Sequence, residues 1–476
     1  MCDSAAAVNK NPKQIRQFIA AIIANLNSVG YGFALGWAAS ALLHLKGPDS
    51  PIGVTLTSDE ASWVASALHL GAFTATPIFT LIPDRIGRKN AGYITATFLI
   101  TGWIIIIFAN SATHLYIARF MCGLCAGCNL VVAPLYVVEI ADTNIRGMLG
   151  SLCILHYNGA IAFAYILGAF ISYHNMLYVG VSFPLIFLCL FFWLPETPKY
   201  LLRNGRVEEA TKSLRWFRGD DHDVKGEIES IMESMKAIET SETGSTAIKD
   251  IICSKAALRG FFILTVFAFN LQLSGITPVL NYTTEIFEEA GGAIPAEYST
   301  IIVGSLQLTG NLAALFLVER AGRKVLLLIS DSLMATSLLA LGVYFYLKDT
   351  GVDVSLVGWV PVLCLSCFVV SLSIGLGPLI YVVLPEIIPS PILWIAQKLC
   401  YCIVWFMAFV MTKYFYITVD SLNMYGSFWL FAACCVLPIP VIIFLLPETK
   451  NKSLESIQLE MRGVETTEMA ENSPKV

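Results

Sequence analysis

Long apolar stretches recur along nearly the whole chain, and short polar stretches separate them. Each is about 20 residues long, the length that a helix needs to cross the hydrocarbon core of a bilayer. The stretches are continuously apolar and do not alternate with polar positions, so the pattern excludes a membrane-spanning barrel. We therefore expect an all-α membrane protein with about twelve transmembrane helices, at 17–43, 60–82, 91–110, 114–138, 148–172, 176–194, 258–288, 299–318, 325–347, 357–388, 393–417 and 422–446.

A polar stretch rich in Glu, Lys and Ser divides the predicted helices into two sets of six. Its own apolar positions indicate short amphipathic helices. The expected organisation is an N-terminal tail (1–16), a six-helix bundle (17–194), a linker with short helices (195–257), a second six-helix bundle (258–446) and a C-terminal tail (447–476).

Three sequence pairs occur in the same order and at equivalent places in the two halves. They are DRIGRK (84–89) with ERAGRK (319–324), PLYVVEIA (134–141) with PLIYVVLPEI (378–387), and PETPKY (195–200) with PETKNK (447–452). Such repeats predict two pseudo-symmetric bundles related by an axis along the membrane normal, with a substrate site between them near the bilayer midplane.

Composition and charge agree with this picture. The chain is 56% hydrophobic and 14% charged, whereas an ordinary soluble domain has about 25% charged residues. With both termini in the cytosol, all basic residues but Lys46, Arg119, Lys348 and Lys413 lie at or near the cytosolic side. Because short cytosolic loops carry the excess of Lys and Arg, we predict this orientation.

Charged residues of both signs gather at the predicted cytosolic helix ends. Carboxylates placed there require cationic partners. If the partners come from different helices, their ion pairs form a latch that breaks when the bundles rock, which gives a two-state element. Simple positive-inside anchoring explains the basic residues but not the acidic ones. The candidate latch residues are Asp84, Arg85, Arg88, Glu139, Arg146, Glu319, Arg320, Arg323 and Glu386.

Polar residues and helix breakers interrupt two apolar stretches. In the seventh, Gly275 and Pro278 loosen a helix that also carries amides and hydroxyls, and the tenth contains GLGPLIYVVLPEIIP. An unsatisfied polar group is costly in lipid, so these side chains face a cavity or another helix. Broken helices of this kind line the pathway of a transporter. The other interpretation is helix–helix hydrogen bonding without a ligand.

These motifs together resemble the sugar-porter branch of the major facilitator superfamily, and the chain is most similar to insect facilitative trehalose transporter-like proteins. The resemblance is carried by PDRIGRK, by Arg119 with Gly123 and Gly127, by PLYVVEIA, PETPKYLL, QLSG, VERAGRK and PETKNKSLE. It implies a carrier that moves a mono- or disaccharide, trehalose or glucose for example, by alternating access.

The resemblance also implies which residues bind the substrate. The candidate substrate-binding residues are Gln272, Thr277, Asn281, Tyr282, Gln307, Tyr381 and Trp405. Thr277 replaces the family's asparagine, and Tyr381 replaces its tryptophan. Three further amide positions are apolar here, at Ile154, Leu271 and Val404. A site built for hydroxyls loses affinity when its amides become aliphatic, so a more apolar solute or a glycoside is the alternative substrate.

Titratable residues within the predicted spans bear on whether transport is coupled to protons. The family's proton symporters carry an aspartate in the first span, where this chain has Gly32. We therefore expect facilitated uniport. Asp331 within the ninth span is a candidate proton site, because an intramembrane carboxylate is functional by default. His69 and His156 also lie within spans, and an interhelical hydrogen bond is the simpler role for all three.

Other classes are less well supported by the sequence. A non-transporting sugar sensor is a lesser alternative, and no filter motif favours a channel. No nucleophile–base or metal-ligand spacing favours an enzyme, and we interpret Cys122, Cys125 and Cys128 as a small-residue helix face. We expect no cofactor, no metal and no nucleic-acid partner, and a monomer in the plasma membrane.

Overall fold

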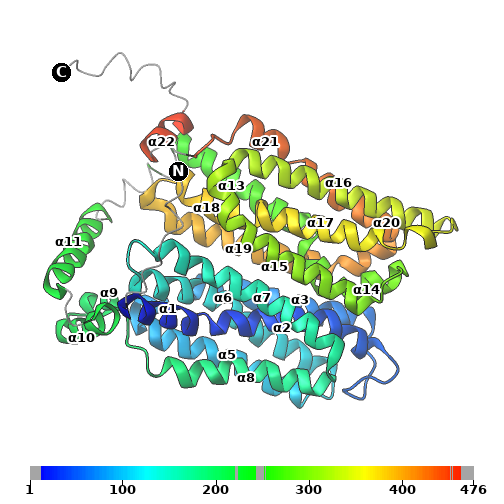
Figure 1. Ribbon diagram of the computed structural model, residues 1–476, viewed down its shortest axis with the longest axis horizontal. Coiled ribbons are helices and arrows are strands. Elements are labelled where there is room, and N and C mark those ends of the chain that lie inside the picture. Colours follow the sequence, from blue (N-terminus) through cyan, green and yellow to red (C-terminus); the bar gives the residue numbers. More distant parts are fainter. Residues whose placement is uncertain are drawn as a thin grey trace.

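The protein is an all-helical bundle in two halves. The computed structural model describes residues 12–219, 223–242, 251, 254–450, 452 and 454–462. Figure 1 shows the N-terminal bundle, in blue to teal, beside the C-terminal bundle, in green to orange. The expected fold class is confirmed: eleven helical segments in the described part are long and apolar enough to cross a membrane.

The N-terminal bundle contains eight helices. They are α1 (Pro12–Ala24), α2 (Leu26–Lys46), α3 (Ser58–Phe79), α4 (Ile82–Ile86), α5 (Arg88–Ile107), α6 (Ala112–Ile140), α7 (Arg146–Phe170) and α8 (Tyr173–Phe191). Helix α3 is not among the eleven apolar segments, but it is 22 residues long and packs along α6. Helices α1 and α2 together make the first span.

The linker and the C-terminal bundle follow in order. The linker forms α9 (Pro198–Arg203), α10 (Val207–Arg218) and α11 (Val224–Glu242). The second bundle contains α13 (Lys255–Leu273), α14 (Ile276–Ala290), α15 (Ala296–Ala321), α16 (Arg323–Asp349), η1 (Ser355–Val357), α17 (Val360–Ile374), α18 (Leu376–Ile387), η2 (Ser390–Ile392), α19 (Leu393–Lys413), α20 (Phe415–Val436), α21 (Ile439–Phe444) and α22 (Leu454–Arg462).

The two ends of the molecule differ. Helices α9–α11 and α22 lie at one end, which we call the linker end, and the loop between α2 and α3 lies at the opposite, distal end (Figure 1). Between the ends the bundles meet through α2 with α14, α7 with α15, and α3 with α19.

Glycines set the spacing of helices that carry the site. A Cβ at Gly71 of α3 would lie 2.2 Å from the carbonyl oxygen of Phe120, and one at Gly123 of α6 would lie 1.9 Å from that of Leu68. Small residues of this kind let helix backbones pack directly against each other. The R-x-x-x-G-x-x-x-G motif therefore fixes α3 against α6.

The two expected helix breaks are present. Gly275 has a φ of +81°, which is why a glycine separates α13 from α14. A second kink follows at Tyr282, whose φ and ψ are −116° and 17°. Gly375 separates α17 from α18 with a different, non-helical conformation, a φ of −108° and a ψ of −99°. The breaks bring short helix ends and their side chains to the middle of the bundle.

Candidate functional site

A central cavity of about 190 Å³ lies between the two bundles. Helices of both halves line it, and the polar contributors include Gln272, Thr277 and Gln307 of the C-terminal bundle. Tyr381 and Trp405, the two predicted aromatic residues, line it as well. Five of the seven predicted substrate-binding residues therefore meet in one place.

The break between α13 and α14 lets two of these residues contact each other. Gln272 is in the last turn of α13 and Thr277 in the first turn of α14. The Thr277 hydroxyl donates a hydrogen bond to the Gln272 side-chain oxygen. The helix break thus presents a hydroxyl–amide pair to the cavity, where a continuous helix would turn the two residues apart.

A hydrogen bond joins the two bundles across the cavity. The Gln307 Nε2 of α15 donates to the Asn158 Oδ1 of α7 at 2.9 Å, and Asn158 in turn donates to the Ile154 carbonyl oxygen at 3.0 Å. Sequence reasoning missed Asn158, although a lone amide within an apolar span was a usable signal. It also missed Tyr31, Tyr157, Asn311 and Ser373, which line the same cavity.

Two predicted residues lie away from this cavity, toward the distal end. The Asn281 amide donates to the Thr277 carbonyl oxygen within its own helix at 2.9 Å. The Tyr282 hydroxyl donates to the Thr412 carbonyl oxygen at 3.2 Å, and its ring stacks on Phe415 at 5.1 Å. Tyr282 lines a second cavity of about 670 Å³ that also contains Lys46, Glu285 and Tyr416. The kink at Tyr282 follows Asn281, so it bears on the direction of Tyr282 only, whereas the Asn281 amide is bonded within the preceding turn.

Much of the central cavity wall is apolar. Ile154, Leu271 and Val404 all line the cavity, so the three amide positions of the family pattern that are apolar here face the site. Substitution of these amides therefore leaves fewer polar contacts for a ligand and more surface for an apolar one.

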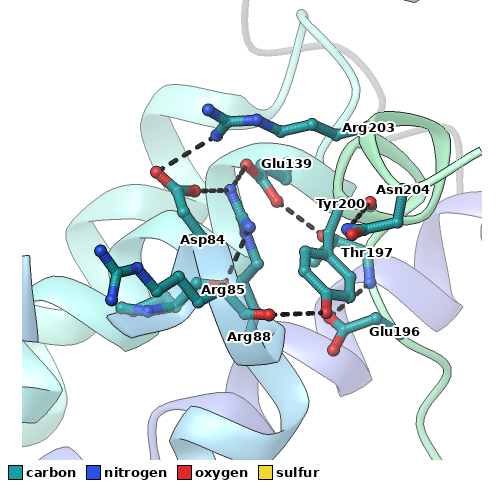
Figure 2. Close-up of polar contacts among 10 residues, drawn as sticks. Asp84, Arg85, Arg88, Glu139, Glu196, Thr197, Tyr200, Arg203 and Asn204 are labelled. Carbon is teal, nitrogen blue, oxygen red and sulfur yellow. Dashed lines mark hydrogen bonds and ion pairs between the residues drawn. The ribbon is translucent and has the colours of Figure 1, made fainter. Parts of the chain in front are cut away.

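An ion-pair network braces the linker end of the N-terminal bundle (Figure 2). Arg88 of α5 lies 2.8 Å from Glu139 of α6 and 2.8 Å from Asp84, and Arg203 of the linker lies 3.2 Å from Asp84. The Thr197 hydroxyl donates to Glu139 at 2.6 Å. Arg88 and Glu139 are almost fully buried, at 3% and 4% side-chain exposure, so each satisfies a charge that would otherwise be isolated.

The C-terminal bundle repeats this network. Arg323 lies 3.0 Å from Glu386, and the Thr449 hydroxyl donates to Glu386 at 2.6 Å. Glu448 accepts hydrogen bonds from the backbone N–H groups of Arg323 and Lys324, as Glu196 does from that of Lys89 in the first half. The duplicated motifs thus have duplicated contacts.

The remaining predicted latch residues are less engaged. Arg85 is exposed, the Arg146 guanidinium lies 3.5 Å from the Ala141 carbonyl oxygen, and the Arg320 carbonyl oxygen accepts a hydrogen bond from Lys450. The side chain of Glu319 lies outside the described residues. The pairs found at the linker end join different helices of one bundle, and among the described side chains none of them joins the two bundles.

Two charge clusters tie the bundles together at the distal end instead. Lys46 of α2 lies 3.1 Å from Glu285 of α14, whose carboxylate also accepts from Tyr416 at 2.7 Å. Lys413 of α19 lies 2.5 Å from Asp59 of α3. Lys46 and Lys413 are two of the four basic residues that departed from the positive-inside pattern. In this conformation the bundles are therefore joined at the distal end.

The N-terminal bundle contains a buried arginine that pairs with backbone groups. Arg119 donates to the carbonyl oxygens of Val64, at 3.0 Å, and Ala34, and lies over the Trp37 ring at 5.5 Å.

The position of the family symporters' aspartate is tightly packed in this chain. A Cβ at Gly32 would lie 2.5 Å from the Tyr157 carbonyl oxygen, so α2 and α7 leave no room there for a carboxylate.

The intramembrane aspartate is in the other bundle. Asp331 is fully buried and accepts hydrogen bonds from the Asn270 amide at 3.1 and 3.2 Å. It is not among the residues that line the central cavity. His156 lies 2.7 Å from the Leu152 carbonyl oxygen within its own helix, whereas His69 lines the cavity.

Comparisons with known proteins complete the description. Residues 20–461 match the model of a family described as "Sugar (and other) transporter". The chain is 34% identical to the facilitated trehalose transporter Tret1 of Bombyx mori over 94% of this chain and 86% of that one. It is 33% identical to Tret1 of Drosophila virilis, again over 94% of this chain, but spans about half of that relative (49%).

Solved structures share the fold. The inward open conformation of the xylose transporter XylE from E. coli superposes with a TM-score of 0.76 at 23% identity, covering 93% of this chain and 99% of that one. The proton:xylose symporter XylE bound to 6-bromo-6-deoxy-D-glucose gives 0.72 at 21% identity, covering 94% and 99%.

Proposed function

The chain belongs to the family of sugar and other transporters, and on that premise we propose that it carries a single-ring sugar or a small glycoside through the central cavity by alternating access. It is a multi-pass membrane carrier for sugars, not an enzyme. The observation that carries the proposal is the cavity itself, which lies between two duplicated bundles and takes polar side chains from both.

The size of the cavity favours a small substrate. Its volume of about 190 Å³ is below the ~300–1,000 Å³ of most small-molecule pockets. The relatives' names refer to trehalose, which has two rings. A cavity of this volume suits one ring better than two, so we assign one ring to the site. The apolar wall at Ile154, Leu271 and Val404 supports a glycoside as the second candidate.

Uniport is the proposed mode of coupling. Close packing at Gly32 leaves no room for the carboxylate that the family's symporters carry in the first span. Asp331 is hydrogen-bonded to Asn270 inside one bundle and away from the cavity, which favours a structural role over proton transfer.

The proposed orientation puts the linker end in the cytosol and the distal end outside the plasma membrane, with both termini cytosolic. The arginine- and lysine-rich loops at the linker end support it. In this assignment the distal ion pairs close the outer side, and the carrier is in its cytosol-facing state. The linker-end pairs of each bundle are proposed to dock against the other bundle when the outer side opens.

The test is uptake into proteoliposomes that contain the purified full-length protein. The panel is labelled D-glucose, D-xylose, methyl and phenyl glucosides and trehalose, each with wild type and Gln272→Ala. We expect D-glucose or the glucosides to equilibrate, trehalose to enter more slowly, and Gln272→Ala to slow entry. Absence of uptake for the whole panel would overturn the proposal. Accumulation driven by a pH gradient and lost in Asp331→Asn would overturn uniport.

A further inference from the structure

His69 is placed in the central cavity by a helix that no motif of the sequence connects with substrate. It lies on α3, where the close packing at Gly71 and Gly123 fixes that helix against α6. Only 2% of the residue is exposed, and it lines the cavity. Its ring stacks on Trp405 of α19, with centroids 6.0 Å apart and an interplanar angle of 24°. The pair therefore connects the bundles at the level of the cavity.

The polar atoms of this pair are not used by the protein. Within the described part of the chain, neither ring nitrogen of His69 has a hydrogen-bond partner, and neither has Nε1 of Trp405. Two further atoms of the cavity wall, the Ser373 hydroxyl and the Gln307 side-chain oxygen, also lack a hydrogen-bond partner among the described residues. Buried donors and acceptors are normally paired, and leaving them unpaired costs stability.

A second histidine of the bundle shows the difference. His156 lies on α7, and its Nδ1 contacts the Leu152 carbonyl oxygen at 2.7 Å. That contact is the local satisfaction expected of a structural histidine. A buried ring with two free nitrogens at a cavity has no such structural explanation.

We propose that His69 is a specificity-determining residue that hydrogen-bonds a hydroxyl group of the substrate, with the Trp405 N–H as a second donor from the opposite bundle. A neutral imidazole offers one donor and one acceptor, the same combination as an amide. His69 thus supplies the polar recognition that is lost where Ile154, Leu271 and Val404 carry no amide. The inference rests on the proposed role of the cavity as the sugar site.

The stacking also defines how the sugar approaches. The His69 ring lies beside one face of Trp405 at an offset, with centroids 6.0 Å apart, and limits the room for a sugar ring to stack there. The substrate instead meets the edges of the two rings, where the nitrogens are. Recognition at this point depends on the position of a hydroxyl rather than on an apolar sugar face.

The experiment compares His69→Leu, which removes both nitrogens, with His69→Gln, which keeps a donor and an acceptor. Phe73→Leu is the matched control, because Phe73 pairs with Phe406 across the same helices at 5.5 Å without lining the cavity. Initial rates in proteoliposomes give KM and kcat for D-glucose and for its 1-, 2-, 3-, 4- and 6-deoxy analogues.

We expect His69→Leu to raise the KM for D-glucose at least tenfold with a smaller change in kcat. His69→Gln and Phe73→Leu should stay within about threefold of wild type. For one deoxy analogue, the one that lacks the contacted hydroxyl, wild type and His69→Leu should have the same KM. An unchanged KM in His69→Leu, or an equal loss for every analogue, would overturn the inference.

Thermal unfolding without sugar separates recognition from structure. Because His69→Leu replaces unpaired polar atoms with an apolar group of similar volume, its Tm should equal or exceed that of wild type. A fall of several degrees would show that the ring is structural and would overturn the inference. If wild type transports neither D-glucose nor a glucoside, the proposed function of the cavity fails. An unchanged Tm in His69→Leu would then show that this failure does not come from a structural role of the ring.

Discussion

The ammonium group of Lys413 lies 2.5 Å from a carboxylate oxygen of Asp59, so one ion pair ties α19 of the C-terminal bundle to α3 of the N-terminal bundle. The two partners differ in environment. The Lys413 side chain is 10% exposed and that of Asp59 72%. Lys413 also donates to Ser62 at 2.8 Å and lies over the Trp63 ring at 4.6 Å. The lysine is thus a nearly buried cation that relies on contacts from the opposite bundle.

Removing the charge of Asp59 should open the distal end. Asp59→Asn removes the counter-ion that Lys413 has in the conformation with a closed distal end. An ion pair with an exposed partner stabilises that conformation by about 0.2–1 kcal/mol. A shift of about 1 kcal/mol changes the ratio of the two states about fivefold. The distance between spin labels on the distal ends of α3 and α19 should show a larger population of the longer separation.

The matched control for that variant is Asp353→Asn. Asp353 also lies at the distal end, but it caps the backbone N–H of Ser355 within its own bundle at 2.9 Å. Its substitution should leave the distance distribution unchanged. Equal distributions for Asp59→Asn and wild type would show that the Lys413–Asp59 pair does not bias the conformation.

The two linker-end networks should differ in their contribution to stability, although their contacts match. Arg88 and Glu139 are 3% and 4% exposed, whereas Arg323 and Glu386 are 16% and 22% exposed. Loss of one partner of a buried pair costs about 3–5 kcal/mol, and a partly exposed pair contributes about 0–1 kcal/mol. Glu139→Gln should therefore lower the free energy of unfolding by about 3 kcal/mol, and Glu386→Gln by about 1 kcal/mol.

Denaturant titration in mixed micelles measures both variants. Thr197→Val and Thr449→Val, which remove the hydroxyl donors to the two carboxylates, are the companion substitutions and should follow the same order. Equal losses for Glu139→Gln and Glu386→Gln would mean that burial does not decide the strength of these networks.

Glu196 should make stability depend on pH. Burial raises the pKa of this carboxyl group, although the backbone N–H groups of Thr197 and Lys89 and the charge of Arg88 oppose the shift. A carboxyl group with a raised pKa binds its proton more tightly when the protein is folded. Its contribution to stability is therefore present below the ordinary pKa of about 4.3 and is lost as the pH rises through the raised value.

Glu196→Gln removes the titration and keeps one of the two acceptor oxygens, so one of the two backbone donors loses its partner at every pH. Its Tm should fall less than that of wild type between pH 4 and pH 7. Glu209→Gln, on the exposed side of α10, is the control and should retain the wild-type slope. A slope in Glu196→Gln equal to that of wild type would assign the pH dependence to other groups.

Restoring an amide at Ile154 should improve sugar binding. Ile154 faces the cavity where the family pattern has a glutamine. A neutral hydrogen bond contributes about 0.5–1.5 kcal/mol net, so Ile154→Gln should lower the KM for D-glucose about two- to tenfold. The KM for phenyl glucoside should stay constant or rise, because apolar surface is lost. Ile154→Leu is the control, and a lower KM for both substrates would contradict the explanation.

The sequence allowed the larger features of the fold to be predicted, because each has a local cause. Repeated motifs predicted two bundles, and Gly275 predicted the break between α13 and α14, which the structure has. The second kink, at Tyr282, has no glycine or proline at its own position, so the sequence does not predict that Tyr282 points away from the central cavity. Asn281 is also absent from the cavity wall, because its amide bonds to the Thr277 carbonyl oxygen of its own helix.

The contacts between bundles could not be predicted, because the partners are far apart in the chain. Lys46 and Glu285 are 239 positions apart, and Lys413 and Asp59 are 354 positions apart. In the sequence the two lysines were only exceptions to a charge rule. His69 was likewise visible as a polar residue in a span, but its free nitrogens and its contact with Trp405 depend on how α3 meets α19.

The hydrogen bond between Gln307 and Asn158 bears on the half of the transport cycle in which no sugar is bound. In the empty cavity the Gln307 side-chain NH2 and the Asn158 side-chain oxygen satisfy each other, one from each bundle. A substrate that hydrogen-bonds to Gln307 displaces its bond with Asn158, so the number of hydrogen bonds in the cavity does not increase. In the proposed uniport cycle, this exchange narrows the difference in stability between the loaded and the empty cavity.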